Sequence, residues 1–315
     1  MFFALITVFS CKKNDNLPVE STGKTNSVSI IIDDDLWNGE IGDSLRNKFA
    51  APVIGLPQEE PLFTINQFPV KLLEGFMTNS RNIIVIKKET KSQFDIFENE
   101  YAKPQNVVHI SGKSVVEILD TLQKNSSKII DKIKKTEILE YQKTNKKALL
   151  NSKKINAKFS IDIDIPKSYK YVMRRNKFIW IKKEVSSGSL SLVAYQVPFS
   201  AISNNKKLTT QIIKTRDSIG NLYIHGSARN TRMQTDNSFV PYLSKTIIGG
   251  KPANETKGLW QMNNDFMAGP FINYNILDKK HNRILVVEGF CYAPSKEKRD
   301  FMFELESIIK SIKIK

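Results

Sequence analysis

The chain has 315 residues, of which 40% are hydrophobic and 10% aromatic, and its formal net charge is +16 at pH 7. This length and composition allow a sizeable buried core and predict two domains. The cysteines are Cys11 and Cys291, so modification of Cys11 leaves a lone thiol and excludes an intramolecular disulfide.

The first eleven residues, "MFFALITVFSC", form an apolar run that ends in Cys11. The run is too short for a transmembrane helix, which needs about 20 apolar residues, but it fits the apolar region of a signal peptide. "VFSC" resembles the bacterial lipobox, although Phe9 is bulky for its position. No basic residue precedes the run, so we expect the true start upstream. The resemblance implies that residues 1–10 are a signal peptide and that Cys11 is lipidated.

Residues 11–26 are polar and contain Pro18 and Gly23, which is typical of a flexible linker. A linker between a short apolar run and a globular part is what a tethered protein needs. The alternative is that the run forms a buried first strand. We expect a lipid-anchored protein of the cell envelope, in contact with the membrane through its lipid. Lys12 replaces the Asp that retains other bacterial lipoproteins in the inner membrane, which favours the outer membrane.

Residues 27–142 are expected to form an N-terminal α+β domain. Residues 27–33 indicate a buried strand, and Trp37, Ile41, Leu45 and Phe49 share one face of a helix with Asp34 or Asp35 as its N-cap. Ser111 is expected to cap a long helix whose apolar period is lost near Thr136. Further strands are expected at residues 63–68, 81–88 and 106–111, with a short helix near 69–78.

Residues 143–156 are Lys-rich and are expected to form the linker between two domains. Residues 111–160 hold twelve Lys and five Asp or Glu, and the remaining positive charge is spread along the chain as Lys rather than Arg. Nucleic-acid-binding proteins usually combine Arg with stacking aromatic residues. We therefore expect a solvated Lys-rich surface and no nucleic acid among the partners.

Residues 157–315 are expected to form a C-terminal α+β domain. Phe159, Ile161, Ile163 and Ile165 alternate as in a half-buried strand, and Ser187–Gly188 marks a hairpin turn. A helix is expected near 205–217, two long strands at 268–277 and 282–293, and an amphipathic helix from residue 295 to the end. Both halves combine strands with a long last helix, which predicts an α+β fold with mostly antiparallel sheets.

Several segments support a family resemblance: "LPVESTGKTN", "GEIGDSLRNKF", "GLPQEEPLF", "RNII", "LWQMNNDFMAGPF" and "VVEGFCYAPSKEKRDFMFELESIIKSI". With these segments the chain resembles an uncharacterised Bacteroidota lipoprotein family, domain-of-unknown-function family 4837. The resemblance implies lipidation at Cys11 and an envelope location, and no known activity. The order of elements in residues 157–315 also resembles the PsbP/Mog1-like α/β/α sandwich, whose members are mostly non-enzymatic adaptors.

No catalytic motif is present in the sequence. Nothing matches a P-loop, G-x-G-x-x-G, G-x-S-x-G, H-E-x-x-H or zinc-ligand spacing. Asp33, Asp34 and Asp35 are better explained by a strand exit and a helix cap than by calcium. Cys291 lies in a predicted strand and is expected to be buried. We therefore expect no metal and no cofactor, and the sequence favours a non-enzymatic role over an enzymatic one without deciding between them.

Two loops are candidates for binding. The first holds His225, Arg229 and Arg232, where paired Arg side chains suit phosphate or carboxylate, although a solvated loop explains them too. The second holds Glu59 and Glu60 between two prolines that stiffen it. We expect this acidic loop to form part of a recognition surface, facing the two Arg residues. The alternative is a plain turn that connects a helix to a strand.

Two classes of function follow from these observations. The leading prediction is a lipid-anchored envelope protein with a non-enzymatic binding or assembly role, and another envelope protein is the expected partner. The alternative is an envelope hydrolase whose site is formed by loops from both halves. That alternative requires His225 or His109 to meet a carboxylate across a cleft.

Overall fold

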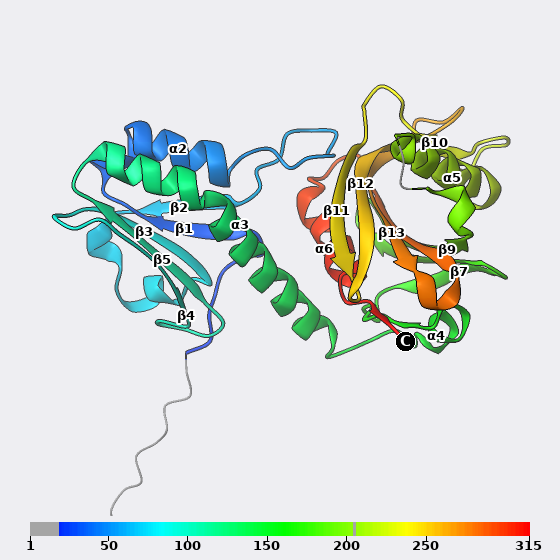
Figure 1. The fold of residues 1–315 in the computed structure, drawn as a ribbon, viewed down its shortest axis with the longest axis horizontal. Coiled ribbons are helices and arrows are strands. Elements are labelled where there is room, and N and C mark those ends of the chain that lie inside the picture. Colours follow the sequence, from blue (N-terminus) through cyan, green and yellow to red (C-terminus); the bar gives the residue numbers. More distant parts are fainter. Residues whose placement is uncertain (1–18, 204–205) are drawn as a thin grey trace, which may run out of the picture.

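The computed structural model describes residues 19–203 and 206–315. Its N-terminal half ends with a long helix that reaches the C-terminal half, a curved sheet with helices on both faces (Figure 1). The predicted signal peptide, residues 1–10, and the predicted lipidation site Cys11 lie outside the described residues. Residues 19–26 of the predicted linker lie against the N-terminal half, where Glu20 and Thr22 form bridges to Lys103 and Ser80.

The N-terminal sheet has five strands in the order β2-β1-β3-β5-β4. Its pairs β1–β2, β1–β3 and β3–β5 are parallel, and β4–β5 is antiparallel. The expectation of a mostly antiparallel sheet is therefore wrong for this half. The chain passes from β1 to β2 through helices and from β2 to β3 through short 3-10 turns. Each of these connections returns the chain to the end of the sheet where the previous strand began, so the strands run parallel. The strands are β1 (Ser27–Ile31), β2 (Thr64–Phe68), β3 (Asn82–Lys88), β4 (Gln93–Glu98) and β5 (Asn106–Gly112).

Helices α1 (Asp34–Trp37), α2 (Glu40–Phe49) and α3 (Val115–Asn145) accompany this sheet, and α2 and α3 cover one face (Figure 1). Apolar side chains of β1, β3 and β5 pack there against α2 and α3 in one buried cluster. The short turns η1 (Val70–Leu72) and η2 (Gly75–Asn79) follow β2, and Val70 packs near buried residues of the opposite face.

Helix α3 begins and ends elsewhere than the sequence indicates. Its N-cap is Ser114, whose side chain accepts a hydrogen bond from the backbone N–H of Glu117. The helix continues past Thr136. Its apolar period is interrupted there because Glu137 takes a buried position and accepts a hydrogen bond of 2.7 Å from Arg81 Nε. A polar residue with a buried partner breaks the apolar period without ending the helix.

The stretch 143–156, predicted as a linker, is mostly exposed, and its role as a linker stays a prediction. Its first residues complete α3, and helix α4 (Lys153–Phe159) places Ile155 and Phe159 in the core of the C-terminal half. The stretch is therefore fixed at both ends by regular helices.

The C-terminal sheet is antiparallel, with strand order β10-β12-β13-β14-β9-β8-β7 and β11 paired to β12. The α+β fold class is confirmed, and antiparallel pairing is confirmed for this half. The strands are β7 (Lys170–Arg175), β8 (Phe178–Val185), β9 (Gly188–Val197), β10 (Met233–Thr235), β11 (Tyr242–Ile248), β12 (Lys251–Met262), β13 (Ala268–Asp278) and β14 (Arg283–Tyr292).

The hairpin turn between β8 and β9 lies where the sequence predicts it. Gly188 has φ +153°, and a Cβ there would lie 1.8 Å from the backbone oxygen of Tyr292. Only glycine fits this close approach of two backbones.

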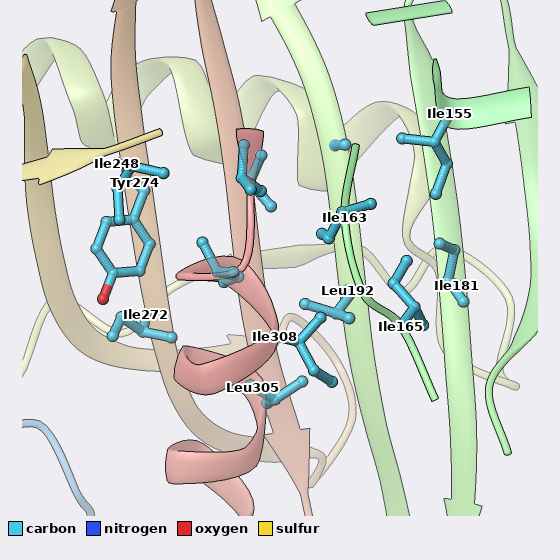
Figure 2. Close-up of a cluster of buried hydrophobic side chains, with 14 of the residues drawn as sticks. Ile155, Ile163, Ile165, Ile181, Leu192, Ile248, Ile272, Tyr274, Leu305 and Ile308 are labelled. Atoms are coloured by element: carbon cyan, nitrogen blue, oxygen red, sulfur yellow. The ribbon is translucent and has the colours of Figure 1, made fainter. Parts of the chain in front are cut away.

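Helix α6 (Arg299–Ile309) covers one face of the C-terminal sheet and builds its largest buried cluster (Figure 2). Leu305 and Ile308 project from α6 toward Leu192 of β9 and Ile165 of the incoming segment. Ile161, Ile163 and Ile165 are all buried, as their alternation predicts, although only β6 (Ile161–Asp162) forms a regular strand, paired with β15 (Lys313–Ile314).

Helix α5 (Leu208–Tyr223) covers the other face and runs beyond the predicted end at residue 217. It carries Arg216, whose guanidinium lies 2.9 Å from the Glu288 carboxylate and 4.0 Å from the centre of the Phe271 ring. Both members of this ion pair are buried, so removal of one partner would leave an uncompensated charge in the core.

Candidate functional site

A loop of the N-terminal half, residues 51–62, crosses to the C-terminal half, and we call it the strap (Figure 1). It folds as a hairpin in which the Val53 N–H donates to the Glu60 carbonyl at 2.9 Å and the Leu62 N–H donates to the Ala51 carbonyl at 2.8 Å. Gly55 has φ +87°, and a Cβ there would lie 2.9 Å from Cβ of Lys257 on β12. The strap therefore lies against β12 with space for glycine alone at its crossing point.

Glu60 fixes the base of the strap to helix α6. Its carboxylate accepts hydrogen bonds from the backbone N–H of Lys298 at 2.7 and 2.9 Å and from that of Arg299 at 2.7 Å. A carboxylate at a helix N-terminus satisfies free backbone donors and complements the helix dipole. Glu60 is 5% exposed, so it is not part of an exposed acidic tip. Glu59 is exposed, and a binding role for it stays a prediction.

Further contacts hold the two halves together around the start of α6. The Arg299 guanidinium donates to the Pro61 carbonyl at 3.0 Å and to the Thr64 hydroxyl at 3.1 Å. The Asn26 amide donates to the Asp300 carboxylate at 2.9 Å. The strap and the first turn of α6 thus form one hydrogen-bonded unit that joins the halves.

A cavity of about 60 Å³ lies under the strap, between α3, β12 and α6. Most of its wall is apolar and comes from the strap and α6, whereas Lys134, Lys257 and Glu306 form its polar end. The apolar side chains include Val53, Leu56, Leu62, Met302 and Phe303. An apolar cavity with a few convergent polar groups is the usual form of a ligand site.

A polar groove of about 390 Å³ continues from this end of the cavity, along α3. Lys134, Lys257 and Glu306 line both spaces, so they separate the cavity from the groove. Lys257 Nζ lies 3.2 Å from a Glu255 oxygen and 4.0 Å from a Glu306 oxygen, and Lys310 forms an ion pair with Glu306. The second Glu255 oxygen accepts a hydrogen bond of 2.6 Å from the Tyr274 hydroxyl.

The charges of this cluster shift the pKa values of its members. Burial favours neutral Glu306, but the nearby Lys257 and Lys310 outweigh burial and lower the pKa of Glu306 to about 2. Burial likewise favours neutral Lys257, but the Glu306 and Glu255 carboxylates outweigh it and raise the Lys257 pKa. For Lys134 burial dominates, so its pKa is lowered.

The other predicted binding residues lie away from the strap. Arg232 follows α5, and its backbone N–H bonds to the Asn263 side chain in the β12–β13 turn. His225 and Arg229 are exposed in the same loop. In the described parts of the chain, no hydrogen bond or ion pair joins Arg229 or Arg232 to Glu59 or Glu60. The expected pairing is therefore not formed, and binding by the Arg loop stays a prediction.

The remaining candidate catalytic residues, two histidines and a cysteine, lie apart from one another. His109 Nε2 lies 2.8 Å from a Glu100 oxygen within the N-terminal half, and His225 contacts the backbone oxygen of Asn221. Neither histidine lines the cavity under the strap. Within residues 19–203 and 206–315, no three potential metal-ligating side chains cluster. Cys291 is buried, and its burial raises its pKa to about 12.

The charged residues of the cavity and the groove, which together we call the cleft, were not among the predicted site residues, although two local spacings indicate some of them. Glu255 and Lys257 are two residues apart in a strand, and Glu306 and Lys310 are four apart in a helix, so each pair shares a face. Nothing local indicates that Lys134 joins them, because its place depends on how α3 packs against α6.

Comparison with known sequences shows that the chain belongs to the family Domain of unknown function (DUF4837), which matches residues 148–311 and so more than half of it. Residues 21–146 match a second family, Domain of unknown function (DUF8532). Domain-of-unknown-function family 4837 is thus confirmed, but it covers the C-terminal half rather than both halves, and its description as a Bacteroidota lipoprotein family stays a prediction. No curated protein matches the chain.

Three solved structures resemble part of the chain at low similarity. A mutant of the protein Mog1 is 8% identical with a TM-score of 0.30, covering 49% of this chain and 90% of its own. LpqN, involved in cell envelope biogenesis of Mycobacterium tuberculosis, is 10% identical with a TM-score of 0.28, covering 49% and 82%. Human StAR-related lipid transfer protein 5 is 8% identical with a TM-score of 0.25, covering 55% and 97%. No helix among the described residues has the length and apolar character needed to cross a bilayer.

Proposed function

We propose that this member of the DUF4837 family is a lipid-anchored protein of the cell envelope that binds a ligand or partner without catalysing a reaction. The observation that carries the proposal is the N-terminal sequence, in which an apolar run ends in "VFSC" and a polar stretch follows. Acyl chains on Cys11 would hold the protein at a membrane, because each buried methylene contributes about 0.8 kcal/mol.

The cleft between the halves supports the binding part of the proposal. It combines an apolar wall with a lysine and glutamate cluster, and the strap closes one side of it. A non-enzymatic binding site needs shape and charge alone, and the cleft supplies both. The hydrolase alternative has no observation in its favour at this cleft, since neither His109 nor His225 reaches it.

The outer membrane is the proposed location, because Lys12 follows Cys11 where an inner-membrane signal would place Asp. Another envelope protein is the proposed partner for the exposed Glu59 side of the strap and for the loop of Arg229 and Arg232. These surfaces face solvent and differ in charge, so they could contact different regions of one partner.

The anchor is tested by expressing the gene with its upstream codons and replacing Cys11 with Ser. The native protein is expected to sediment with membranes and to incorporate labelled palmitate, whereas Cys11→Ser is expected to do neither. Cys291→Ser is the matched control, because Cys291 is buried and lies far along the chain. If Cys11→Ser still sediments and takes up as much label as the native protein, the anchor proposal fails.

A further inference from the structure

Lys134 is the unpaired cation at the boundary between the cavity and the groove. Two carboxylates of the groove are already engaged, Glu306 by Lys310 and Glu255 by Lys257 and Tyr274. The third, Asp131, lies one helical turn before Lys134 in the described part of α3 and forms no ion pair with it within 4 Å. Within the described residues, the Lys134 ammonium has no hydrogen bond and no ion pair within 4 Å. An ammonium carries three N–H donors, so donors of Lys134 remain available for a ligand at this point.

The net charge of the cluster favours a negative ligand. Lys134, Lys135, Lys257 and Lys310 contribute four positive charges to the groove, and Asp131, Glu255 and Glu306 contribute three negative charges. One positive charge therefore remains uncompensated where the apolar cavity meets the groove. Lys134 is partly removed from water there, and this burial lowers the pKa of its ammonium. An anion beside Lys134 would restore the solvation that the ammonium loses.

The cavity next to Lys134 suits an apolar group. Val53, Leu56 and Leu62 of the strap face Met302 and Phe303 of α6 across it. A ligand with its apolar part under the strap would place its other end at Lys134, and the groove beyond has room for a larger polar group.

We propose that the cleft under the strap binds a small amphiphilic anion, with a short apolar group in the cavity of about 60 Å³ and its carboxylate or phosphate head on Lys134. Lys257 supports the head from β12, and Glu306 positions Lys257 and Lys310 rather than touching the ligand. The proposal deepens the proposed function by naming the chemical class of the ligand. It does not depend on the lipid anchor, because the cleft lies entirely within the described residues.

Isothermal titration calorimetry of the full chain carrying Cys11→Ser tests the proposal without the anchor. The probes are propanoate, propyl phosphate and the uncharged propanol, whose short apolar groups suit a cavity of about 60 Å³, and octanol serves as a second uncharged probe. Both anions are expected to bind at least tenfold more tightly than either alcohol, because only the anions can pair with Lys134. The tighter of the two anions identifies the head group as carboxylate or phosphate.

Two variants locate the binding. Lys134→Met is expected to weaken binding of the better anion at least tenfold, whereas Lys124→Met, at an exposed position on the same helix, is expected to leave it unchanged. Val53→Trp fills the cavity from the strap and is expected to abolish binding of the apolar group. Thermal unfolding of each variant checks that it is folded.

The proposal is overturned if neither anion binds, if either alcohol binds as tightly as the anions, or if folded Lys134→Met binds like Lys124→Met. Palmitate labelling of the native protein is a separate measurement. If the native protein incorporates palmitate but the cleft binds neither anion, only the ligand proposal fails. If the cleft binds an anion but the native protein incorporates no palmitate, only the anchor proposal fails.

Discussion

Replacing Glu60 with Gln tests whether the strap is a structural link between the halves. The native carboxylate accepts N–H groups on both of its oxygens, whereas the Gln amide replaces one oxygen with a donor that would face another donor. Hydrogen bonds to a charged group contribute about 1.5–3 kcal/mol, and the charge at the start of α6 adds a dipole contribution of about 1 kcal/mol. We therefore expect Glu60→Gln to lower the free energy of unfolding by about 2.5–4 kcal/mol.

The assay is thermal unfolding followed by circular dichroism, with Glu59→Gln as the matched control. A chain of this size shifts its midpoint by roughly 2 °C per kcal/mol, so Glu60→Gln is expected to lose about 5–8 °C. Glu59 is exposed and forms none of these bonds, so its variant is expected to stay within about 1 °C of native, as surface substitutions usually do. Equal midpoints for the two variants would refute the role assigned to Glu60.

Two further predictions concern buried titratable groups. Because the pKa of Glu306 is about 2 in the folded chain and its ordinary value is 4.5, its contribution is complete above pH 4.5 and is lost as the pH falls toward 2. Urea unfolding at pH 5 and pH 3 should show that Glu306→Gln removes part of this loss, on the order of 3 kcal/mol at most, while the exposed Glu297→Gln does not; equal acid sensitivity would contradict the assignment. In the Cys11→Ser protein, Cys291 is expected to resist iodoacetamide at pH 8 until urea unfolds the chain, because burial raises its pKa to about 12, and rapid labelling of the native protein would disagree with that burial.

Periodicity alone predicts the buried elements well. The apolar spacing of Trp37, Ile41, Leu45 and Phe49 indicates a helical face. The structure divides this segment into α1 and α2, and the last three side chains, all in α2, are buried in the cluster against the sheet. Alternation also identifies Ile161, Ile163 and Ile165 as inward-facing, although most of that segment is not a regular strand. Burial follows from local pattern, since it depends on which face of the segment is apolar.

Strand direction and long-range contacts could not be predicted in this way. The parallel pairing in the N-terminal half depends on the path of crossovers between strands, and a strand sequence does not encode that path. The strand Gln93–Glu98 was missed because it is only half-buried and carries several polar residues. Such an edge strand lacks a strong apolar pattern.

The strap was identified from its sequence as important, but its structural role differs from the predicted one. Its prolines and paired glutamates stand out in the sequence, and they suggest an exposed recognition loop. In the structure one glutamate is buried on the α6 backbone and the other is exposed. The difference depends on residues 298 and 299, more than two hundred positions away, so no local argument could reveal it.

Mass spectrometry of the native protein's N-terminal peptide tests the central claim, a lipid-anchored envelope protein, most directly. The protein would be purified from membranes of its own host and digested, and the first peptide of the mature chain sequenced. We predict a peptide that begins at Cys11 and carries the mass of a diacylglyceryl group and an amide-linked acyl chain. A peptide that continues through Ser10 into an unmodified Cys11 would contradict the account.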